Sequence, residues 1–429
     1  MPTNLLMLTL PALRWRARML LATGLSLFAL AALAPRAQAA GGSVLAVGSA
    51  VRDDNDAVWD RLLQLAGGRG ARVAVFTAPA RDPEAAARAI LASLAKRGLV
   101  GEHIRIGPRI AGQDLAAAVR DPDWIAKVSS AQAVYFSGGA QARLIDLLRP
   151  GRQDSPLMTA VRGVFERGGV VAGESAGAAV MSLDIFREPP QDVLALMKRS
   201  LVAGSDIDQG FGFVRHDVIV DQHLIRRGRI GRLVHLMQQQ GRPLGLGIEE
   251  HTAVVVRGDE VEVVGHRGVL VVELNTALVP AAGTLRVQGA RLSLLDHGDR
   301  FNLNTRRVTP AAARQGSEVA LAAADRRAPA NEEAYGSAFF NDMLADNLFV
   351  TALGRLFTQG LPEVRGLSFA TRPAADDLAP TLGFEWRLSV DAGTRGWRAA
   401  DSPALTLEGV KMDILPVRMA QPLYAPIPL

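Results

Sequence analysis

The chain has 429 residues, of which 48 are Lys or Arg, 43 are Asp or Glu and none is Cys. The lack of cysteine excludes thiol catalysis and cysteine-ligated zinc sites, and it leaves the stability of the protein to its core. The net charge of +5 falls to +1 without the first 39 residues, which hold four arginines and no acid, so the composition does not indicate nucleic-acid binding.

Residues 1–39 predict a secretory signal peptide. Three arginines precede an apolar run from Met19 to Leu33, and the small-residue sequence Ala37-Gln38-Ala39 follows. We expect cleavage near Ala39 and a secreted or periplasmic protein. We expect no stable membrane insertion, since no later stretch reaches the roughly 18 uncharged apolar residues of a spanning helix. An uncleaved N-terminal anchor is the alternative.

From about residue 41 to 271, short apolar runs alternate with helical stretches. Strands are expected within 43–50, 71–80, 131–139 and 168–175, and helices at 56–66 and 83–95. This alternation indicates an α/β fold with a mostly parallel sheet and helices on both faces. Ligands bind beyond the carboxyl ends of such strands, so we expect the loops 137–141 and 173–177 at the same sheet edge. We assign this domain to residues 40–275.

The pattern changes after about residue 276. Strand-like runs occur at 283–295, 367–372 and 383–390, and residues 339–357 predict an amphipathic helix. We interpret residues 276–429 as a C-terminal α+β extension of unknown role. It completes the core, supports a homodimer or docks on an insoluble polymer. Apolar patterns are more often buried than binding, which favours a structural role.

A serine motif ends the strand expected at 168–175. Gly173-Glu174-Ser175-Ala176-Gly177 fits G-x-S-x-G, in which glycines permit a strained turn that exposes the serine hydroxyl at a helix N-terminus. Backbone N–H groups at that helix start can stabilise an oxyanion. Small residues also suit close helix–sheet packing, so Ser175 is either a nucleophile or a packing residue. The apolar strand before it and the apolar helix after it favour the nucleophile.

A candidate base and a candidate acid lie further along the chain. His223 follows a β-like run in VIVDQH, and Glu249 and Glu250 follow the apolar run GLGI. A carboxylate there can orient an imidazole and stabilise its charged form. A structural histidine and a solvated acidic turn are the alternatives. The order Ser, His, acid differs from that of α/β-hydrolases, in which the acid precedes the histidine.

Four arginines follow His223 within ten residues: Arg226, Arg227, Arg229 and Arg232. They are either a solvated basic helix face or, beside a hydrolytic site, guanidinium groups that bind substrate carboxylates in bidentate fashion.

Four motifs together resemble the cyanophycinases, within the group of serine peptidases that includes aspartyl dipeptidase. They are FSGGAQ at 136–141, GESAGAAVM at 173–181, DQHLIRRGRIGRL at 221–233 and GLGIEEHTA at 245–253. Their shared order over about 45–270 is much more specific than any one of them. The resemblance implies a flavodoxin-like α/β fold related to class I glutamine amidotransferases.

The resemblance implies a role for each matching residue. Ser175 would be the nucleophile, His223 the general base and Glu250 the third member of the triad. Gly139 and Ala176 would supply the N–H groups of the oxyanion hole. The resemblance implies a substrate site lined by Gln141, Asp221, Gln222, Arg227, Arg229 and Arg232, to which we add Glu174 as a candidate for binding guanidinium groups.

Three positions depart from the pattern of the family. Glu174 stands where Thr or Ser is usual, Ala140 where Asp is usual, and Glu249 where Asp is usual. None of the three is a triad member. The departures therefore bear on substrate preference more than on reaction type.

The substrate that the resemblance implies is cyanophycin, a polyaspartate with arginine joined to each β-carboxyl group. An exopeptidase would release β-Asp-Arg dipeptides from it through an acyl-enzyme on Ser175. No cofactor and no metal are expected, and the seven histidines show no H-E-x-x-H spacing. The alternatives are a related serine peptidase acting on another aspartyl or β-linked peptide, a secreted carboxylesterase, and an inactive binding protein of the same fold.

Overall fold

The first sheet contains five parallel strands that lead to the serine motif. The computed structural model describes residues 41–49, 51–188, 191–275, 283–320, 339–399, 404–420 and 423. In sheet order, the parallel strands are β3 (Val100–Ile104), β2 (Arg72–Phe76), β4 (Ala133–Phe136), β5 (Val170–Glu174) and β1 (Ser43–Val47). The carboxyl ends of β4 and β5 therefore lie side by side, as expected for loops 137–141 and 173–177.

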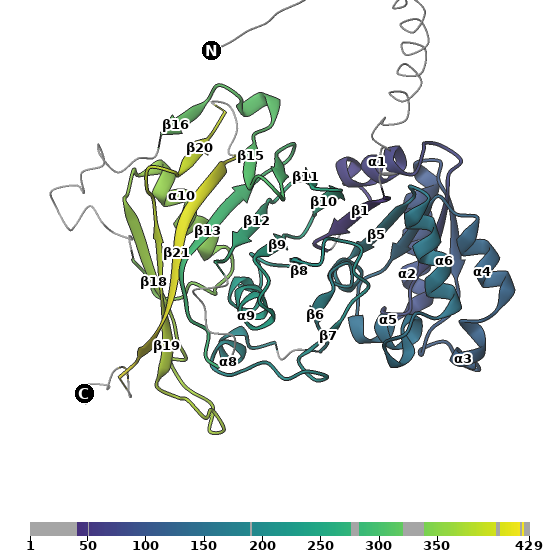
Figure 1. The fold of residues 1–429 in the computed structure, drawn as a ribbon, viewed down its shortest axis with the longest axis horizontal. Helices are drawn as coiled ribbons and strands as arrows, with labels where there is room; N and C mark the ends of the chain where they lie inside the picture. The colour runs from purple at the N-terminus through teal and green to yellow at the C-terminus, as the bar shows by residue number, and fades with distance from the viewer. Residues whose placement is uncertain are drawn as a thin grey trace, which may run out of the picture. The chain divides into compact units, whose positions relative to one another are not determined.

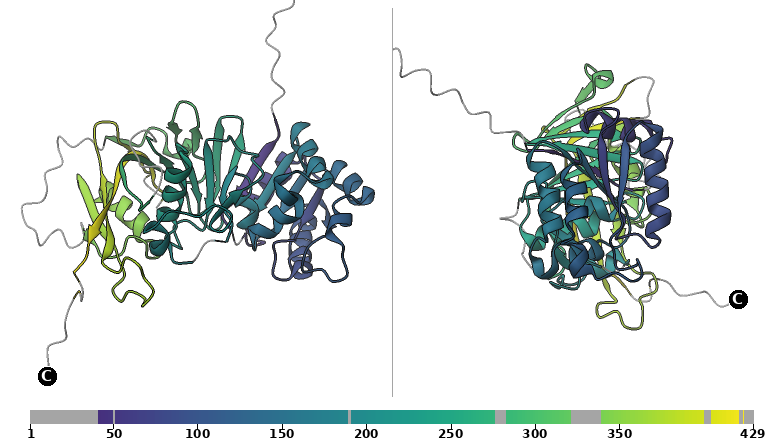
Figure 2. Two further views of the ribbon diagram at one scale, coloured as in Figure 1. Left: turned by 60° about the horizontal axis from the view of Figure 1, so that its bottom comes forward. Right: turned by 90° about the vertical axis from the view of Figure 1, so that its right-hand side faces the viewer.

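Helices cover both faces of these strands. On one face, α1 (Asp56–Leu65) and α2 (Pro83–Lys96) share an apolar cluster with alternate strand residues such as Leu45 and Tyr135. On the other, α5 (Gln141–Leu148) and α6 (Pro156–Glu166) share a cluster with the intervening residues, such as Val44 and Phe136. The helix α4 (Pro122–Ser129) packs on α6, and α3 (Leu115–Ala118) precedes it. Figures 1 and 2 show the strands between the two groups of helices.

Antiparallel strands extend the first sheet beyond β1. β10 (Thr252–Arg257) pairs with β1, and β11 (Glu260–Gly265), β14 (Arg300–Asn302) and β15 (Arg307–Thr309) follow in order. The short turn between β10 and β11 cannot hold the crossover that a parallel pair needs, so these two strands form a hairpin. The sheet is therefore mixed.

A second sheet carries the histidine motif. Its order is β17 (Phe339–Phe340), β18 (Glu363–Ser368), β19 (Leu382–Ser389), β21 (Thr406–Arg418), β13 (Val287–Leu295), β12 (Val269–Glu273), β9 (Leu244–Ile248) and β8 (Val218–Gln222), with β20 (Arg395–Trp397) and β16 (Glu318–Ala320) attached to β21. β8 and β9 are parallel. Three helices share an apolar cluster with this sheet: α8 (Val193–Met197), α9 (Ile230–Gln240) and α10 (Leu348–Thr358) (Figure 1).

The α/β fold with helices on both faces of a parallel sheet is confirmed. The helix predicted at 339–357 begins too early, since residues 339–340 pair with β18 as a strand and α10 begins only at Leu348. The predicted signal peptide at 1–39 lies outside the described residues. Within the described ranges, no helix combines the length and the apolar character that a bilayer crossing requires.

The predicted boundary at residue 275 adjoins residues 276–282, which are outside the described residues. The strands on its two sides, β12 and β13, are antiparallel neighbours in the second sheet. Residues 41–429 form one compact unit. The division into residues 40–275 and an extension therefore stays a prediction about folding, which a shortened chain can test.

Candidate active site

The turn from β5 into α7 (Ala176–Ala179) presents Ser175 in a strained conformation. Ser175 has φ 50° and ψ −110°, a region that side-chain-bearing residues seldom occupy. The two glycines of the motif allow the backbones to approach, because a Cβ at Gly173 would lie 2.5 Å from the Gly177 oxygen and one at Gly177 would lie 2.3 Å from the Phe136 oxygen. The glycine spacing thus has a steric cause, and it exposes the serine hydroxyl.

Ser175, His223 and Glu250 form a hydrogen-bonded chain. Ser175 Oγ lies 3.0 Å from His223 Nε2, and His223 Nδ1 lies 2.7 Å from Glu250 Oε1. Because an ionised carboxylate only accepts, Nδ1 carries the proton and Nε2 is left to accept from the serine hydroxyl. Both the histidine and the glutamate are buried. The geometry is that of a nucleophile, a base and an orienting acid.

The surroundings keep His223 neutral. Burial lowers the pKa of His223 to about 4; the hydrogen bond to Glu250 opposes this, and the charges of Arg227 and Arg229 add to the lowering. Burial also acts to raise the pKa of Glu250, but His223 and Arg226 hold it below its ordinary value. A neutral imidazole beside an ionised carboxylate is the state in which Nε2 can accept a proton.

The three side chains come from both sheets. Ser175 follows β5 of the first sheet, and His223 follows β8 of the second. Glu250 lies in the turn where the chain leaves β9 of the second sheet and enters β10 of the first. The site therefore exists only where the two sheets meet.

Glu249 stabilises the turn after His223. Its Oε2 accepts from the backbone N–H groups of Ile225, at 2.6 Å, and of Arg226, at 3.0 Å. Arg226 also donates through Nη1 to Glu250 Oε2 at 2.9 Å. The two neighbouring acids thus have separate tasks, one on the backbone and one on the imidazole.

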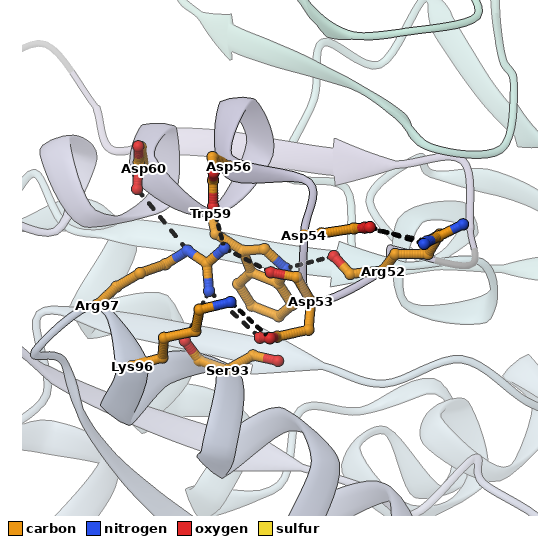
Figure 3. A network of polar contacts seen from close by, with 9 residues as sticks. All are labelled: Arg52, Asp53, Asp54, Asp56, Trp59, Asp60, Ser93, Lys96 and Arg97. Atoms are coloured by element: carbon orange, nitrogen blue, oxygen red, sulfur yellow. Dashed lines mark hydrogen bonds and ion pairs between the residues drawn. The ribbon is translucent and has the colours of Figure 1, made fainter.

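The loop after β1 supports the acidic turn from the other side. Asn55 Nδ2 donates to the His251 carbonyl oxygen at 2.9 Å, and His251 N donates to the Ser49 oxygen at 2.9 Å. Figure 3 shows what holds this loop against α2. Arg97 Nη2 donates to the Asp53 carbonyl oxygen at 2.6 Å, and Lys96 Nζ lies 2.8 Å from Asp53 Oδ2. The position of Glu250 thus depends on contacts well outside the cavity.

Two backbone N–H groups beside Ser175 are available to an oxyanion. Among the described residues, no backbone acceptor is bonded to the N–H of Gly139 or of Ala176. Gly139 has φ 139°, and a Cβ there would lie 2.0 Å from the Pro79 oxygen. Only glycine fits this loop, which Ala140 N holds in place by donating to the same oxygen at 3.0 Å.

Ser175 opens into a cavity of about 270 Å³ that is lined by four arginines. The predicted residues that line it are Gly139, Gln141, Gln222, Arg227, Arg229 and Arg232. Burial, and then the charge of Arg232, lower the pKa of Arg229 to about 9. Arg229 is therefore still protonated at neutral pH, and the cavity attracts an anion.

Asp221 does not line the cavity but holds Arg232 in place. Its two carboxylate oxygens accept from Arg232, with Nε at 2.7 Å from Oδ2. Arg229 donates to the backbone carbonyl oxygen of Gln222 at 2.9 Å and to its side-chain oxygen Oε1. These contacts aim the guanidinium groups, so Asp221 acts on the cavity through Arg232.

Glu174 lies away from this cavity, which corrects the predicted contact with a substrate guanidinium. Side chains alternate along β5, and residues 170, 172 and 174 face α1 and α2. Glu174 accordingly lines a different cavity, beside Trp59 and Tyr135. Burial raises the pKa of Glu174, and the backbone N–H groups of Gly138 and Val51 oppose the rise.

Sequence reasoning did not assign four residues of the site. Arg187, Glu188 and Gln191 line the cavity from the loop after β6 (Asp184–Phe186), which pairs with β7 (Ile207–Gln209). Their only signal was their place in a segment long enough to cover the cleft. Arg226 was noted as a basic residue, but its partner Glu250 is 24 residues away and has no local signature.

No metal centre is apparent in the described part of the chain, where no group of three or more His, Asp or Glu side chains could hold an ion.

The comparisons with known proteins agree with this geometry. Residues 44–264 match the sequence model of peptidase family S51. The chain is 32% identical over 278 residues to the cyanophycinase of Geminocystis herdmanii. This alignment covers 61% of this chain and 94% of that protein. The chain is 36% identical over 200 residues to the cyanophycinase of Trichormus variabilis, covering 43% and 62% of the two chains.

Among solved structures, a peptidase from an acI-B1 actinobacterium is similar, with a TM-score of 0.44, 21% identity, and coverage of 62% of this chain and 98% of that one. The chain is a hydrolase that acts as a peptidase. It belongs to peptidase family S51.

Proposed function

We propose that this protein is a serine exopeptidase that hydrolyses cyanophycin to β-Asp-Arg dipeptides. One observation carries the proposal: Ser175, hydrogen-bonded to His223 and through it to Glu250, lines a cavity with four guanidinium groups. Relatives named cyanophycinase support the choice of polymer. Each arginyl branch of that polymer ends in a free carboxylate, for which guanidinium groups are well suited.

In the proposed acylation step, Ser175 Oγ attacks the scissile carbonyl carbon and passes its proton to His223 Nε2. The carbonyl oxygen becomes an oxyanion, which accepts from the N–H groups of Gly139 and Ala176. The imidazolium then gives its proton to the leaving amine as the C–N bond breaks. Glu250 holds Nδ1–H throughout and stabilises the positive charge.

In the proposed deacylation step, a water molecule takes the place of the amine. His223 accepts a proton from the water as its oxygen attacks the ester of Ser175. The second tetrahedral intermediate collapses, Ser175 recovers its proton from His223, and the carboxylate product leaves. The reaction needs only residues of this chain and water.

The test is the release of soluble dipeptide from insoluble cyanophycin, identified by mass, with Ser175→Ala as the variant. We expect release to fall at least about 10⁴-fold, because loss of a serine nucleophile removes the covalent route. Ser130→Ala is the matched control, since Ser130 is an exposed serine on the turn after α4. Release by the Ser175→Ala protein at the rate of the control would overturn the proposal.

A related peptidase acting on another aspartyl or β-linked peptide is the second candidate function, favoured by Ala140, which lines the cavity where the family usually has Asp. Labelling of Ser175 by a serine-reactive probe, together with intact cyanophycin, would support this candidate. A panel of β-aspartyl peptides and simple esters would then identify the substrate class and separate it from a carboxylesterase.

We also propose that the protein is exported and that residues 1–39 are removed. The order of basic, apolar and small residues supports this proposal. The mass and N-terminal sequence of the protein from the expressing cell's exterior or periplasm test it, and a protein that retains Met1 would contradict it. Sedimentation of the same material tests the predicted homodimer.

A further inference from the structure

A second cavity adjoins the one at Ser175. Its volume is about 260 Å³, and Gln191 and Arg227 line both cavities. The two cavities therefore share a wall. The other residues that line the second cavity are Asp192, Val193, Leu194, Asp342, Leu344, Ser368 and Phe369.

The C-terminal strands build the far wall of the second cavity. Asp342 and Leu344 lie between β17 and α10, and Phe369 directly follows β18. The backbone of Leu344 approaches residues 226–229, which we call the arginine loop, so closely that a Cβ at Gly228 would lie 1.8 Å from the Leu344 oxygen. Met343 N donates to the Leu367 oxygen at 2.8 Å and holds the segment on β18.

This wall lies outside the residues that the family's sequence model matches, which end at 264. The first cavity is lined by residues 139–232, all within that match. The second cavity is therefore lined on one side by residues within the family match, 191–194 and Arg227, and on the other by residues of the C-terminal region. The side chains that the C-terminal region supplies therefore help to decide which ligand this cavity binds.

The side chains in the second cavity suit a guanidinium group. Asp192 and Asp342 each use Oδ1 to accept a backbone N–H, from Ala195 and Leu344 respectively. In the described part of the chain, Oδ2 of each has no hydrogen-bond partner. The half-buried ring of Phe369 lies in the same lining. Two carboxylates beside an aromatic ring are the groups that pair with a guanidinium and stack on it.

The shared wall contributes the opposite charge. Arg227 is exposed, and no described residue makes a hydrogen bond or an ion pair with its guanidinium. By contrast, Arg229 and Arg232 are held by Gln222 and Asp221. The fourth arginine, Arg187, is paired with Asp146 and Asp208. Arg227 is thus the arginine of the two cavities that is free to bind a ligand carboxylate from either side.

We propose that the second cavity is a subsite for the arginyl branch of the aspartyl residue next to the one whose backbone bond is cleaved. Asp342 and Asp192 bind its guanidinium, and Arg227 binds its carboxylate. This inference rests on the proposed function, because it takes the repeating arginyl branches of cyanophycin as the ligand. The C-terminal region then sets a preference for substrates that are long enough to fill both cavities.

The test compares two soluble oligomers, with two and with four β-Asp-Arg repeats, and measures the ratio of kcat/KM for the longer to that for the shorter. The variant is Asp342→Asn, which keeps Oδ1 as the acceptor for Leu344 N and removes the charge. We expect the ratio to fall about threefold to fivefold through a higher KM for the longer oligomer, as for the loss of an exposed charge pair.

Two further variants control for structural effects. Asp346→Asn removes an exposed carboxylate of the same segment, and Asp346 lines neither cavity. We expect this variant to show the same kcat/KM ratio as the unmutated protein. Asp342→Glu keeps the charge, and we expect it to retain the ratio within about twofold. Equal unfolding temperatures of the Asn variants establish that both fold.

The outcomes separate the two proposals. If the unmutated protein cleaves both oligomers and Asp342→Asn leaves the ratio unchanged, the subsite is overturned and the proposed function stands. If the unmutated protein cleaves neither oligomer nor the polymer, the proposed function is overturned and the subsite with it. A fall in the ratio that Asp346→Asn reproduces also overturns the subsite, because the effect would then be one of general surface charge.

Discussion

His223 is a base whose resting state is controlled by its neighbours. Because its pKa is lowered to about 4, the imidazole stays neutral, and able to accept a proton, at pH values where an ordinary histidine would be charged. We expect kcat/KM to be maintained from pH 7 down to well below 6.5 and to decline as His223 is protonated. A pH profile of kcat/KM on a soluble oligomer measures this decline.

The charge of Arg227 is part of the cause. Removing this charge weakens the repulsion of a protonated His223, so Arg227→Gln is expected to raise the pKa of His223. The decline of kcat/KM on the acid side of the pH profile then moves to higher pH. Arg88→Gln, which removes an exposed arginine on α2, is the matched control. Coincident acid limbs for the two variants would show that the arginine loop does not act on the base.

The two adjacent acids, Glu249 and Glu250, allow a direct comparison of catalysis and folding. Glu250→Gln is expected to lower kcat about 10³-fold, because the imidazolium loses its charged partner while the fold is kept. Glu249→Gln is expected to cost about 1–2 kcal/mol of stability with a much smaller loss of kcat, since it weakens two backbone hydrogen bonds. Kinetics and denaturant unfolding on both proteins measure the difference; equal losses of kcat would contradict the separate roles.

At the scale of elements, the β5–α7 turn has little room for a larger residue. A Cβ at Gly177 would lie 2.3 Å from the Phe136 oxygen, which is backbone and cannot move aside without opening the sheet. We expect Gly177→Ala to destabilise the protein by more than about 2 kcal/mol. In α10, nothing lies within 4 Å of a Cβ at Gly354, so Gly354→Ala is expected to stabilise by about 0.5–1 kcal/mol. Denaturant unfolding of both variants checks the opposite signs.

Four strands of the first sheet, β1, β2, β4 and β5, could be predicted because each is a short apolar run bounded by turn residues. The edge strand β3 was not predicted, since its sequence VGEHI is not an apolar run. The start of the C-terminal helix could not be predicted, since Phe339 and Phe340 fit an apolar helix face equally well until β18 pairs with them. Nor does an apolar run reveal its partner strand. The assignment of β8 and β9 to a second sheet therefore appears only in the structure.

In the candidate site, too, some residues could be recognised from the sequence and others could not. Ser175, His223 and Glu250 were recognised from motifs at strand ends, and the structure brings them together. Glu174 was assigned to the substrate from its position in sequence, but the alternation of side chains along β5 turns it to the opposite face. Asp342 had no local signal, because only the docking of Leu344 on Gly228 carries it to the arginine loop.

At the scale of the whole molecule, the sheet that carries His223 depends on strands from the last third of the chain. β12 pairs with β13, and β13 pairs with β21. A chain of residues 41–275 loses both partner strands and much of the apolar cluster beneath them. Each large apolar side chain buried there contributes roughly 1.5–3 kcal/mol, so the loss exceeds a typical total stability of roughly 5–15 kcal/mol.

We therefore expect the 41–275 chain to be unfolded or insoluble and Ser175 in it to resist a serine-reactive probe. Circular dichroism and probe labelling, with the 41–429 chain as control, measure this. A soluble, folded and labelled 41–275 chain would instead establish residues 40–275 as an independent domain.

The order of strands has a consequence for the time at which activity arises. Among the described strands, β21 is the last to be synthesised, yet it lies inside its sheet, between β19 and β13. When Ser175, His223 and Glu250 have been synthesised, the inner strand of the sheet that carries His223 has therefore not yet been made. We therefore expect Ser175 to be unreactive toward surrounding proteins in a nascent chain, and equally so in a chain that terminates early.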